Sequence, residues 1–185
     1  MPETDERLRL RALRTSDEQV FSQAHQELAA EGFEFGIHYR PGMPWDDYLR
    51  AVSDQALGLN LPQGWVRNTR LVADVGGTLV GRTSIRHELN EFLISYGGHI
   101  GYAVVPDQRR RGYAIEILRQ SIDIARTLGI DRVLVTCDDS NTGSVKTIEA
   151  CGGQLENVVA LPPADTPRRR YWIGTSVLGH RNCGP

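Results

Sequence analysis

The stretch of sequence that decides the fold is residues 101–114, GYAVVPDQRRRGYA. Its first half ends an apolar run over 99–105, which predicts a strand. After it, apolar residues recur at steps of three and four up to Leu128, which predicts a helix over about 113–128. A nearly continuous apolar run over 132–137 then predicts a strand buried on both faces. A strand, loop, helix and strand in this order form a crossover that places its two strands parallel.

The loop within this crossover suits a phosphorylated ligand. Three consecutive arginines, Arg109, Arg110 and Arg111, precede the first helical turn, whose free N–H groups and dipole attract anions. The small residues Gly112 and Ala114 would let phosphates approach the backbone. The chain contains neither GxxxxGK before Ser or Thr nor GxGxxG, which disfavours a P-loop hydrolase and a dinucleotide fold. The alternative is that the arginines form only a solvated turn.

Working outward, hydrophobic period and turn residues predict the other elements. Gly76 and Gly77 form a hairpin turn between two strands, and Thr15 with Glu18 predicts a capping box at a helix start. Asn141 is placed to cap a short helix. The other expected elements are strands over 7–13, 70–75, 78–87, 155–160 and 170–177, helices over 15–30, from Pro44 and over 141–151, and a proline-rich turn over 161–167.

The composition is that of one ordinary globular domain, expected to span residues 1–185. The chain is 40% hydrophobic and 24% charged, so disorder and coiled coil fit poorly. A net charge of -2 provides no field toward nucleic acid or an anionic membrane, and no apolar run reaches the roughly 18 residues of a membrane span. Three cysteines without metal-site spacing predict reduced thiols in a cytoplasmic protein and no metal site. We expect a monomer or a homodimer, the latter through an exposed strand edge near the C-terminus.

The central stretch resembles the core motif of the GNAT superfamily of N-acetyltransferases. In that family a strand ending V-x-P leads into Q/R-x-x-G-x-G/A at a helix start, and Arg109, Gly112 and Ala114 occupy the fixed positions. Asn141 and Ser144, ahead of two glycines, resemble the family's second cofactor segment. The resemblance covers about 71–173. It implies an α/β (α+β) fold: a mixed sheet of about six to seven strands, with an antiparallel N-terminal meander, a β-α-β cofactor crossover and four main helices. Phrases such as SIRHELN and GGHIGY look like a branch of predicted acetyltransferases of unknown acceptor.

The resemblance also implies how acetyl-CoA, the acyl donor, would bind. Backbone groups of Val104 and Val105 should bind the pantetheine arm as an added strand, and the two parallel strands should splay to admit the thioester. Asn141 and Ser144 should lie near the thiol end of that arm. Backbone N–H groups should hold the pyrophosphate; they belong to Arg109, Arg110, Arg111, Gly112, Tyr113 and Ala114.

Acetylation of an amine needs a polarised carbonyl and a base, and several residues are candidates. The N–H at Val104 can polarise the carbonyl. His99 opens the cofactor strand where many relatives carry a glutamate base, and its ordinary pKa near 6.5 suits proton abstraction. The alternative for His99 is a structural histidine within the sheet. His87 and Glu88, at the end of the preceding strand, could instead act as base, bind the acceptor ammonium, or simply face solvent.

One residue departs from the family pattern. The usual general acid is a tyrosine seven residues after the Asn141 position, and here Ile148 stands there. The acid is therefore missing, replaced by Tyr102 or Tyr171, or supplied by water. A thiolate is a tolerable leaving group, so its loss need not abolish turnover.

The acceptor is expected to bind over the segment 15–62. Aromatic and acidic side chains there, with Glu34, Phe35 and Trp45 as candidates beside His87, suit a cationic amine, although the aromatic ones could equally be core residues. A sizeable lid-like stretch over 32–62 favours an enclosed pocket and a small acceptor. Two further functions stay open: a protein or peptide N-acetyltransferase, and a non-catalytic acyl-CoA-binding sensor.

Overall fold

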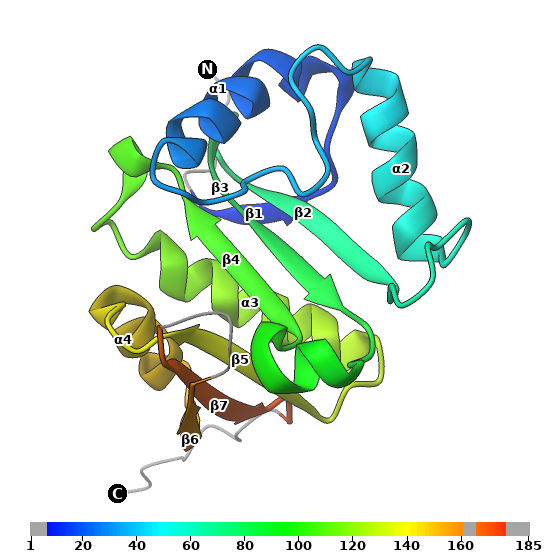
Figure 1. The fold of residues 1–185 in the computed structure, drawn as a ribbon. Coiled ribbons are helices and arrows are strands. Elements are labelled where there is room, and N and C mark those ends of the chain that lie inside the picture. Colours follow the sequence, from blue (N-terminus) through cyan, green and yellow to red (C-terminus); the bar gives the residue numbers. More distant parts are fainter. Residues whose placement is uncertain (1–6, 161–165, 177–185) are drawn as a thin grey trace, which may run out of the picture.

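The computed structural model describes residues 7–160 and 166–176, and a single twisted sheet of seven strands runs through it (Figure 1). The strand order is β1-β2-β3-β4-β5-β7-β6, and every neighbouring pair is antiparallel except β4 and β5. The strands are β1 (Arg9–Arg11), β2 (Asn68–Val75), β3 (Thr78–Arg86), β4 (Ile100–Val104), β5 (Arg132–Asp138), β6 (Gln154–Val159) and β7 (Arg168–Gly174). The main helices are α1 (Glu18–Ala29), α2 (Trp45–Leu57), α3 (Tyr113–Thr127) and α4 (Thr142–Ala150). The expected mixed sheet with four main helices is therefore confirmed.

The hairpin between β2 and β3 begins the antiparallel meander. Its turn residues Gly76 and Gly77 have φ of 56° and 89°, the left-handed values that a tight two-residue turn requires. β4 then pairs antiparallel with β3, and the crossover through α3 brings β5 parallel to β4. The crossover predicted from residues 101–114 is confirmed.

The two largest hydrophobic cores among the described residues lie on opposite faces of the sheet. On one face, α1 and α2 bury aromatic side chains against β2 and β3; on the other, α3 and α4 pack Leu118 and Ile148 against β5 and β7. Figure 1 shows α1 and α2 beside the β1–β3 end of the sheet, and α4 beside β5 and β7. The strand β4 lies between these two halves and contributes to both cores.

Several expected details are wrong. Thr15 does not cap a helix: a 3-10 turn over Thr15–Asp17 precedes α1, and the Asp17 carboxylate accepts from the Arg14 N–H at 2.8 Å. The Asp17 carboxylate also binds the Arg11 guanidinium, at 2.7 Å. This buried ion pair orders the start of the helix, and the expected capping box of Thr15 and Glu18 does not form. The stretch between β3 and β4, expected as loop, contains a π-helical turn over Leu93–Gly97.

Other boundaries differ only slightly. The strand expected over 7–13 is limited to Arg9–Arg11, and Pro106–Gln108 forms a 3-10 turn after β4. Most of the expected turn over 161–167 and the end of the strand expected over 170–177 lie outside the described residues. None of the helices in the described ranges is both long and apolar enough to span a membrane.

Candidate functional site

The loop before α3 presents an array of backbone donors. Arg110 and Gly112 have φ of 66° and 83°, so this part of the chain alternates into the left-handed region and turns consecutive N–H groups toward one side. The N–H groups of Ile115 and Glu116 donate to the Gly112 carbonyl, at 3.1 and 3.4 Å. Within the described residues, the five N–H groups before them, from residues 110–114, have no acceptor. Together with the helix dipole they suit a pyrophosphate.

The three arginines of this loop have different surroundings. The Arg109 guanidinium binds the carboxylate of Glu31, in the turn after α1, at 2.6 Å, and its Nε donates to the Val104 carbonyl at 3.4 Å. The hydrogen bond from Arg109 lowers the pKa of Glu31. Arg111 makes only a long contact of 3.5 Å to the Asp107 carbonyl. Arg109 therefore joins the loop to the turn after α1, while Arg110 and Arg111 extend the positive edge of the loop.

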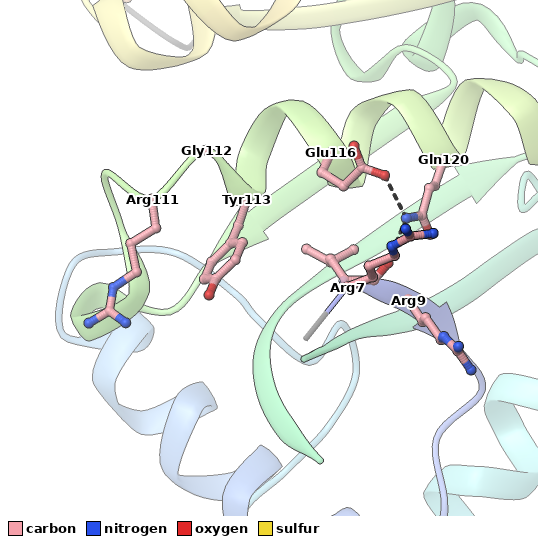
Figure 2. Close-up of a pocket in the computed structure, with 8 residues that line it drawn as sticks. Arg7, Arg9, Arg111, Gly112, Tyr113, Glu116 and Gln120 are labelled. Carbon is pink, nitrogen blue, oxygen red and sulfur yellow. Dashed lines mark hydrogen bonds between the residues drawn. The ribbon is translucent and has the colours of Figure 1, made fainter. Parts of the chain in front are cut away.

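An open groove of about 630 Å³ adjoins this loop on the β1 side of α3. Figure 2 shows Arg111, Gly112 and Tyr113 at one end of it and Arg7 and Arg9 of the N-terminal strand region at the other. Its floor is fixed by Gln120, which donates to the Glu116 carboxylate at 2.8 Å and also bonds the backbone of β1. Arginine side chains at both ends give this groove a positive rim, next to the residues of the loop whose N–H groups suit a phosphate.

Strands β4 and β5 separate just after they meet. Their ladder is limited to the pair Ile100 and Val135, whereas β4 continues to pair with β3 as far as Val104. Alternate residues of β4 direct their backbone groups to β3, as the Val105 N–H does by donating to the Val80 carbonyl at 3.0 Å. The N–H groups of Tyr102 and Val104 consequently face the gap left by β5.

This register changes one part of the expected cofactor strand. Val104 fits the expectation that its backbone N–H faces an arriving ligand, but the Val105 N–H is already used within the sheet. Tyr102 takes its place, since it lies two residues before Val104 on the same edge. Period-2 alternation along β4 was the signal that could have identified it.

The Tyr102 hydroxyl is buried between β4 and α4 without a hydrogen-bond partner. Burial raises the pKa of this phenol to about 12, and Ser144 and Thr147 of α4 lie close enough to affect it. Ile148, which stands where relatives carry their acid, is fully buried in the core beneath α4 (0% exposed). Tyr171 is buried in the same core, and its hydroxyl donates to the Glu149 carboxylate at 3.2 Å. Of the two tyrosines, Tyr102 has the uncommitted hydroxyl.

Asn141 has a defined local role at the start of α4. Its side-chain oxygen accepts from the Ser144 N–H at 3.0 Å, which confirms the predicted helix cap. The first turn of α4 that this cap begins places Ser144 near Tyr102 of β4. Their contact with an acyl donor stays a prediction.

His99 is built into the sheet. It is only 7% exposed, and its Nδ1 accepts from the Leu134 N–H of β5 at 2.9 Å. Its own N–H donates to the Leu134 carbonyl, and its carbonyl accepts from Arg86 of β3. Burial, with a smaller contribution from Arg86, lowers the pKa of His99 to about 4. With Nδ1 accepting, the proton of the neutral ring sits on Nε2, so this geometry favours the structural alternative over a base.

The two other candidates for proton transfer have partners of their own. His87 bonds the Thr69 hydroxyl at 2.8 Å, and partial burial lowers its pKa. Glu88 is exposed and paired with Arg67 at 3.4 Å, which lowers its pKa. Both lie at the far end of β3, and neither contacts the gap beside β4 through a described hydrogen bond.

The aromatic candidates of the acceptor side are core residues. The rings of Phe35 and Trp45 each lie 5.2 Å from that of Phe21, in a cluster of buried aromatics below α1 and α2. The Trp45 indole donates to the Arg14 carbonyl at 3.1 Å. Glu34 is exposed and accepts from the His38 N–H at 2.9 Å. The structure therefore brings Glu34 to the surface and places Phe35 and Trp45 inside.

Neither metal nor thiol chemistry has a site in the described parts of the chain. Groups of three or more potential metal-ligating side chains are absent from residues 7–160 and 166–176. Burial raises the pKa of the Cys137 thiol to about 11 and also raises that of Cys151. Both thiols therefore stay protonated near neutral pH.

The donor loop, the diverging strands and the capped helix beside them define a class of protein, the acetyltransferases that bind acyl-CoA between two splayed strands. Residues 7–154 match the model of the acetyltransferase (GNAT) domain, so the chain belongs to the GNAT acetyltransferase family. Among curated proteins, no sequence match is found.

Solved structures of the same fold include three with informative ligands. RimJ of Mycobacterium smegmatis in complex with CoA-disulfide is 20% identical over 93% of this chain and 84% of its own, with a TM-score of 0.68. The putative acetyltransferase yncA of Salmonella typhimurium, with acetyl-CoA, is 14% identical over 96% and 99%, with a TM-score of 0.63. Spermidine N-acetyltransferase of Vibrio cholerae, with CoA and spermine, is 19% identical over 91% and 96%, also with a TM-score of 0.63. At these identities the likeness establishes the fold alone.

Proposed function

We propose that this protein transfers an acetyl group from acetyl-CoA to a primary amine of a small molecule by direct attack on the thioester. The observation that carries the proposal is the gap between β4 and β5, which leads from the free N–H groups of Tyr102 and Val104 to the donor loop before α3. These groups fit the two ends of acetyl-CoA: amide donors along β4 match the pantetheine arm, and the loop matches the pyrophosphate. Asn141 and Ser144 would line the thiol end of the arm.

Acetyl transfer to an amine requires few side chains in the gap. The amine nitrogen forms a bond to the acetyl carbon, the carbon–sulfur bond breaks, and the proton lost by the amine ends on the thiol of CoA. The Val104 N–H is placed to polarise the carbonyl. Tyr102, with its unpartnered hydroxyl, is the proton donor to sulfur. We assign the role of base to solvent water and not to His99. His87 and Glu88 are the remaining side-chain candidates for this role.

The proposal includes the protein's organisation and setting. The domain spans 1–185, with a cofactor half over about 71–173 and an acceptor side over about 15–62. Cys137 and Cys151 are free thiols, in keeping with a cytoplasmic enzyme. The outer edge of β6, whose residues are almost all exposed, is the edge through which a homodimer would form if the enzyme is not a monomer.

A second function, a non-catalytic acyl-CoA sensor, is favoured by one observation. Ile148 fills the position of the usual acid and is sealed in the core, so this helix supplies no proton donor. The sensor would use the same donor loop and the same gap but would leave the thioester intact.

Calorimetry with acetyl-CoA, followed by thiol release across a panel of amines, tests these functions. Binding together with release from at least one amine establishes the acetyltransferase. Binding without release from any amine favours the sensor, and absence of binding contradicts both.

A further inference from the structure

Three arginines line the acceptor face of the sheet beside β4. Arg70 lies on β2, and Arg82 and Arg86 lie on β3. The register pairs Arg70 with Ser84, the residue between the other two on the same face, so the three side chains share the face covered by α1 and α2. We call these residues the arginine cluster.

The arginine cluster binds backbone carbonyls where carboxylates would be expected. Arg70 donates to the Ile37 carbonyl at 3.1 Å, and Arg82 donates to the Glu34 carbonyl at 3.0 Å. Arg86 donates to the carbonyls of Gly97 and Gly98, both at 3.1 Å. No ion pair between the cluster and an acid is found among the described residues, although the nearby Glu34 acts on Arg70 and Arg82 at longer range.

Two donors of the cluster are left over inside the protein. Arg82 is 8% exposed, and its Nε is buried without a partner, as is the Nε of Arg70. Burial, reinforced by the other arginines, lowers the pKa of both Arg82 and Arg86 to about 10. Burying cations without counter-charges is costly, so an arrangement of this kind calls for an anion.

The cluster lies at the point where β4 and β5 separate. Gly101 follows Ile100, the residue at which the two strands pair, and a side chain on Gly101 would reach the cluster. A Cβ there would come within 3.8 Å of an Arg86 nitrogen and 3.9 Å of an Arg82 nitrogen. The guanidinium groups of Arg82 and Arg86 therefore lie next to β4 at Gly101, eleven residues before Gly112 of the donor loop. The CoA phosphates have their own site at that loop.

The space beside Arg70 and Arg82 is narrow. It has a volume of about 10 Å³, with the Tyr48 ring and apolar side chains as its other walls. A space of this size holds about one water molecule. The space must therefore widen to admit a carboxylate or a phosphate, and Arg70 and Arg86 are the partly exposed members of the cluster.

We propose that the acceptor is a small amine that also carries a carboxylate or a phosphate, and that the arginine cluster binds this anionic group. The proposal rests on the proposed acetyltransferase function and names the acceptor class for it. The anion would receive charge-assisted hydrogen bonds from the free Nε donors while the amine lies over Gly101, at the mouth of the gap. A polyamine, which brings only positive charge to three buried cations, is the wrong acceptor for this site.

Matched pairs of amines test the proposal, with calorimetric titration into the CoA complex as the measurement. The pairs are phenylalanine with phenethylamine, for the carboxylate, and phosphoethanolamine with ethanolamine, for the phosphate; spermidine is the polycation. We expect the anionic member of at least one pair to bind about tenfold tighter or more, since hydrogen bonds to charged groups are strong. The pair that responds tells a carboxylate site from a phosphate site.

Variants assign the preference to the cluster. Arg82→Met keeps the side-chain volume, removes the charge and should abolish the preference. Its unliganded melting temperature should change little, because the loss of a buried cation without a carboxylate partner offsets the loss of its hydrogen bond to Glu34 and its contact with the Phe33 ring. Arg86→Met is the second variant in case Arg82→Met does not fold. Arg126→Met, which removes an exposed ion pair on α3, should change nothing.

The outcomes separate this proposal from the function on which it rests. Failure of acetyl-CoA to bind would overturn the acetyltransferase itself. With acetyl-CoA bound, three results overturn only the anionic acceptor: no tighter binding by either anionic member, tighter binding of spermidine, or a preference unchanged in both cluster variants.

Discussion

The two sides of β4 present different kinds of hydrogen-bond donors. Toward β5 and α3, the protein offers backbone N–H groups set by local conformation, as at Gly112 with its φ of 83°. Toward β2 and β3, it offers long side chains gathered from separate strands, as in the arginine cluster. A site made of backbone tolerates many sequences, whereas a site made of side chains changes with each substitution.

The largest effect should follow from breaking the backbone side at Gly112. In Gly112→Val a β-branched residue must adopt the left-handed region, which costs about 1–2 kcal/mol or more, or the loop must change shape and lose its donor array. We expect acetyl-CoA affinity to fall about 100-fold by calorimetry. The control is Gly129→Val, with a φ of 80° at the other end of α3, which should destabilise the protein without changing affinity. Equal losses of affinity in both variants would contradict the assignment of the loop.

His99 directly precedes β4, between the two sides, and the pH dependence of protein stability tests its role. Its folded pKa of about 4 lies below the ordinary 6.5, so the unfolded chain binds more protons in this window. The stabilisation is complete above pH 6.5 and is lost as pH falls toward 4, on the order of 2 kcal/mol. We expect denaturant titrations of His99→Asn to lose this part of the acid sensitivity.

The same variant separates a structural His99 from a base. Asparagine can still accept from the Leu134 N–H, so the pH dependence of kcat/KM should keep its shape in His99→Asn. If the limb of the kcat/KM profile near neutral pH disappears in this variant and activity falls by about two orders of magnitude, His99 is the base.

A moderate effect is expected at Tyr102, on the cofactor side. Tyr102→Phe removes a buried hydroxyl without a partner, so stability should be unchanged or slightly higher. If the hydroxyl donates a proton to sulfur, kcat should fall about tenfold with acetyl-CoA affinity unchanged, a modest loss for general acid catalysis. Tyr171→Phe is the control, since its hydroxyl is bonded to Glu149. A kcat equal to that of the wild type in Tyr102→Phe would return the proton transfer to water.

The smallest effect should come from the contact that joins the two sides, Arg109 with Glu31. The pair is exposed, at 42% and 45%, so little stability depends on it. Glu31→Gln removes a negative charge near the phosphate loop and releases Arg109, and we expect the KM for acetyl-CoA to fall about twofold at low salt. Asp123→Asn, which breaks a similar pair with Arg126, should leave the KM unchanged. A KM for acetyl-CoA that rises in Glu31→Gln would mean that the pair orders the loop.

The sequence was sufficient for the crossover from β4 to β5 because its information is local. The strand, the basic loop, Gly112 and the helix are consecutive, so hydrophobic period and one glycine define the crossover. The Asn141 cap was likewise predictable from a residue and the helix that follows it. The capping box at Thr15 failed because Arg11, from a strand, competes for the helix start through Asp17.

The acceptor side was poorly predicted because its residues meet only in the folded chain. Aromatic residues near α1 and α2 looked suited to a cationic amine, yet Phe35 and Trp45 pack into the core. Arg82 and Arg86 were not singled out from the sequence, although their spacing of four places both on one face of β3. What no sequence pattern could show is that this face is covered by α1 and α2, which turns solvated charges into buried ones.

Because one edge of β4 faces the gap beside β5 and the other pairs with β3, the proposed donor and acceptor sites share no side chain. A library that varies Arg70, Arg82 and Arg86 would explore new acceptors without disturbing the donor loop. Directed evolution of this scaffold can therefore begin with three codons and retain Gly101, whose missing side chain leaves room for whatever replaces the guanidinium groups.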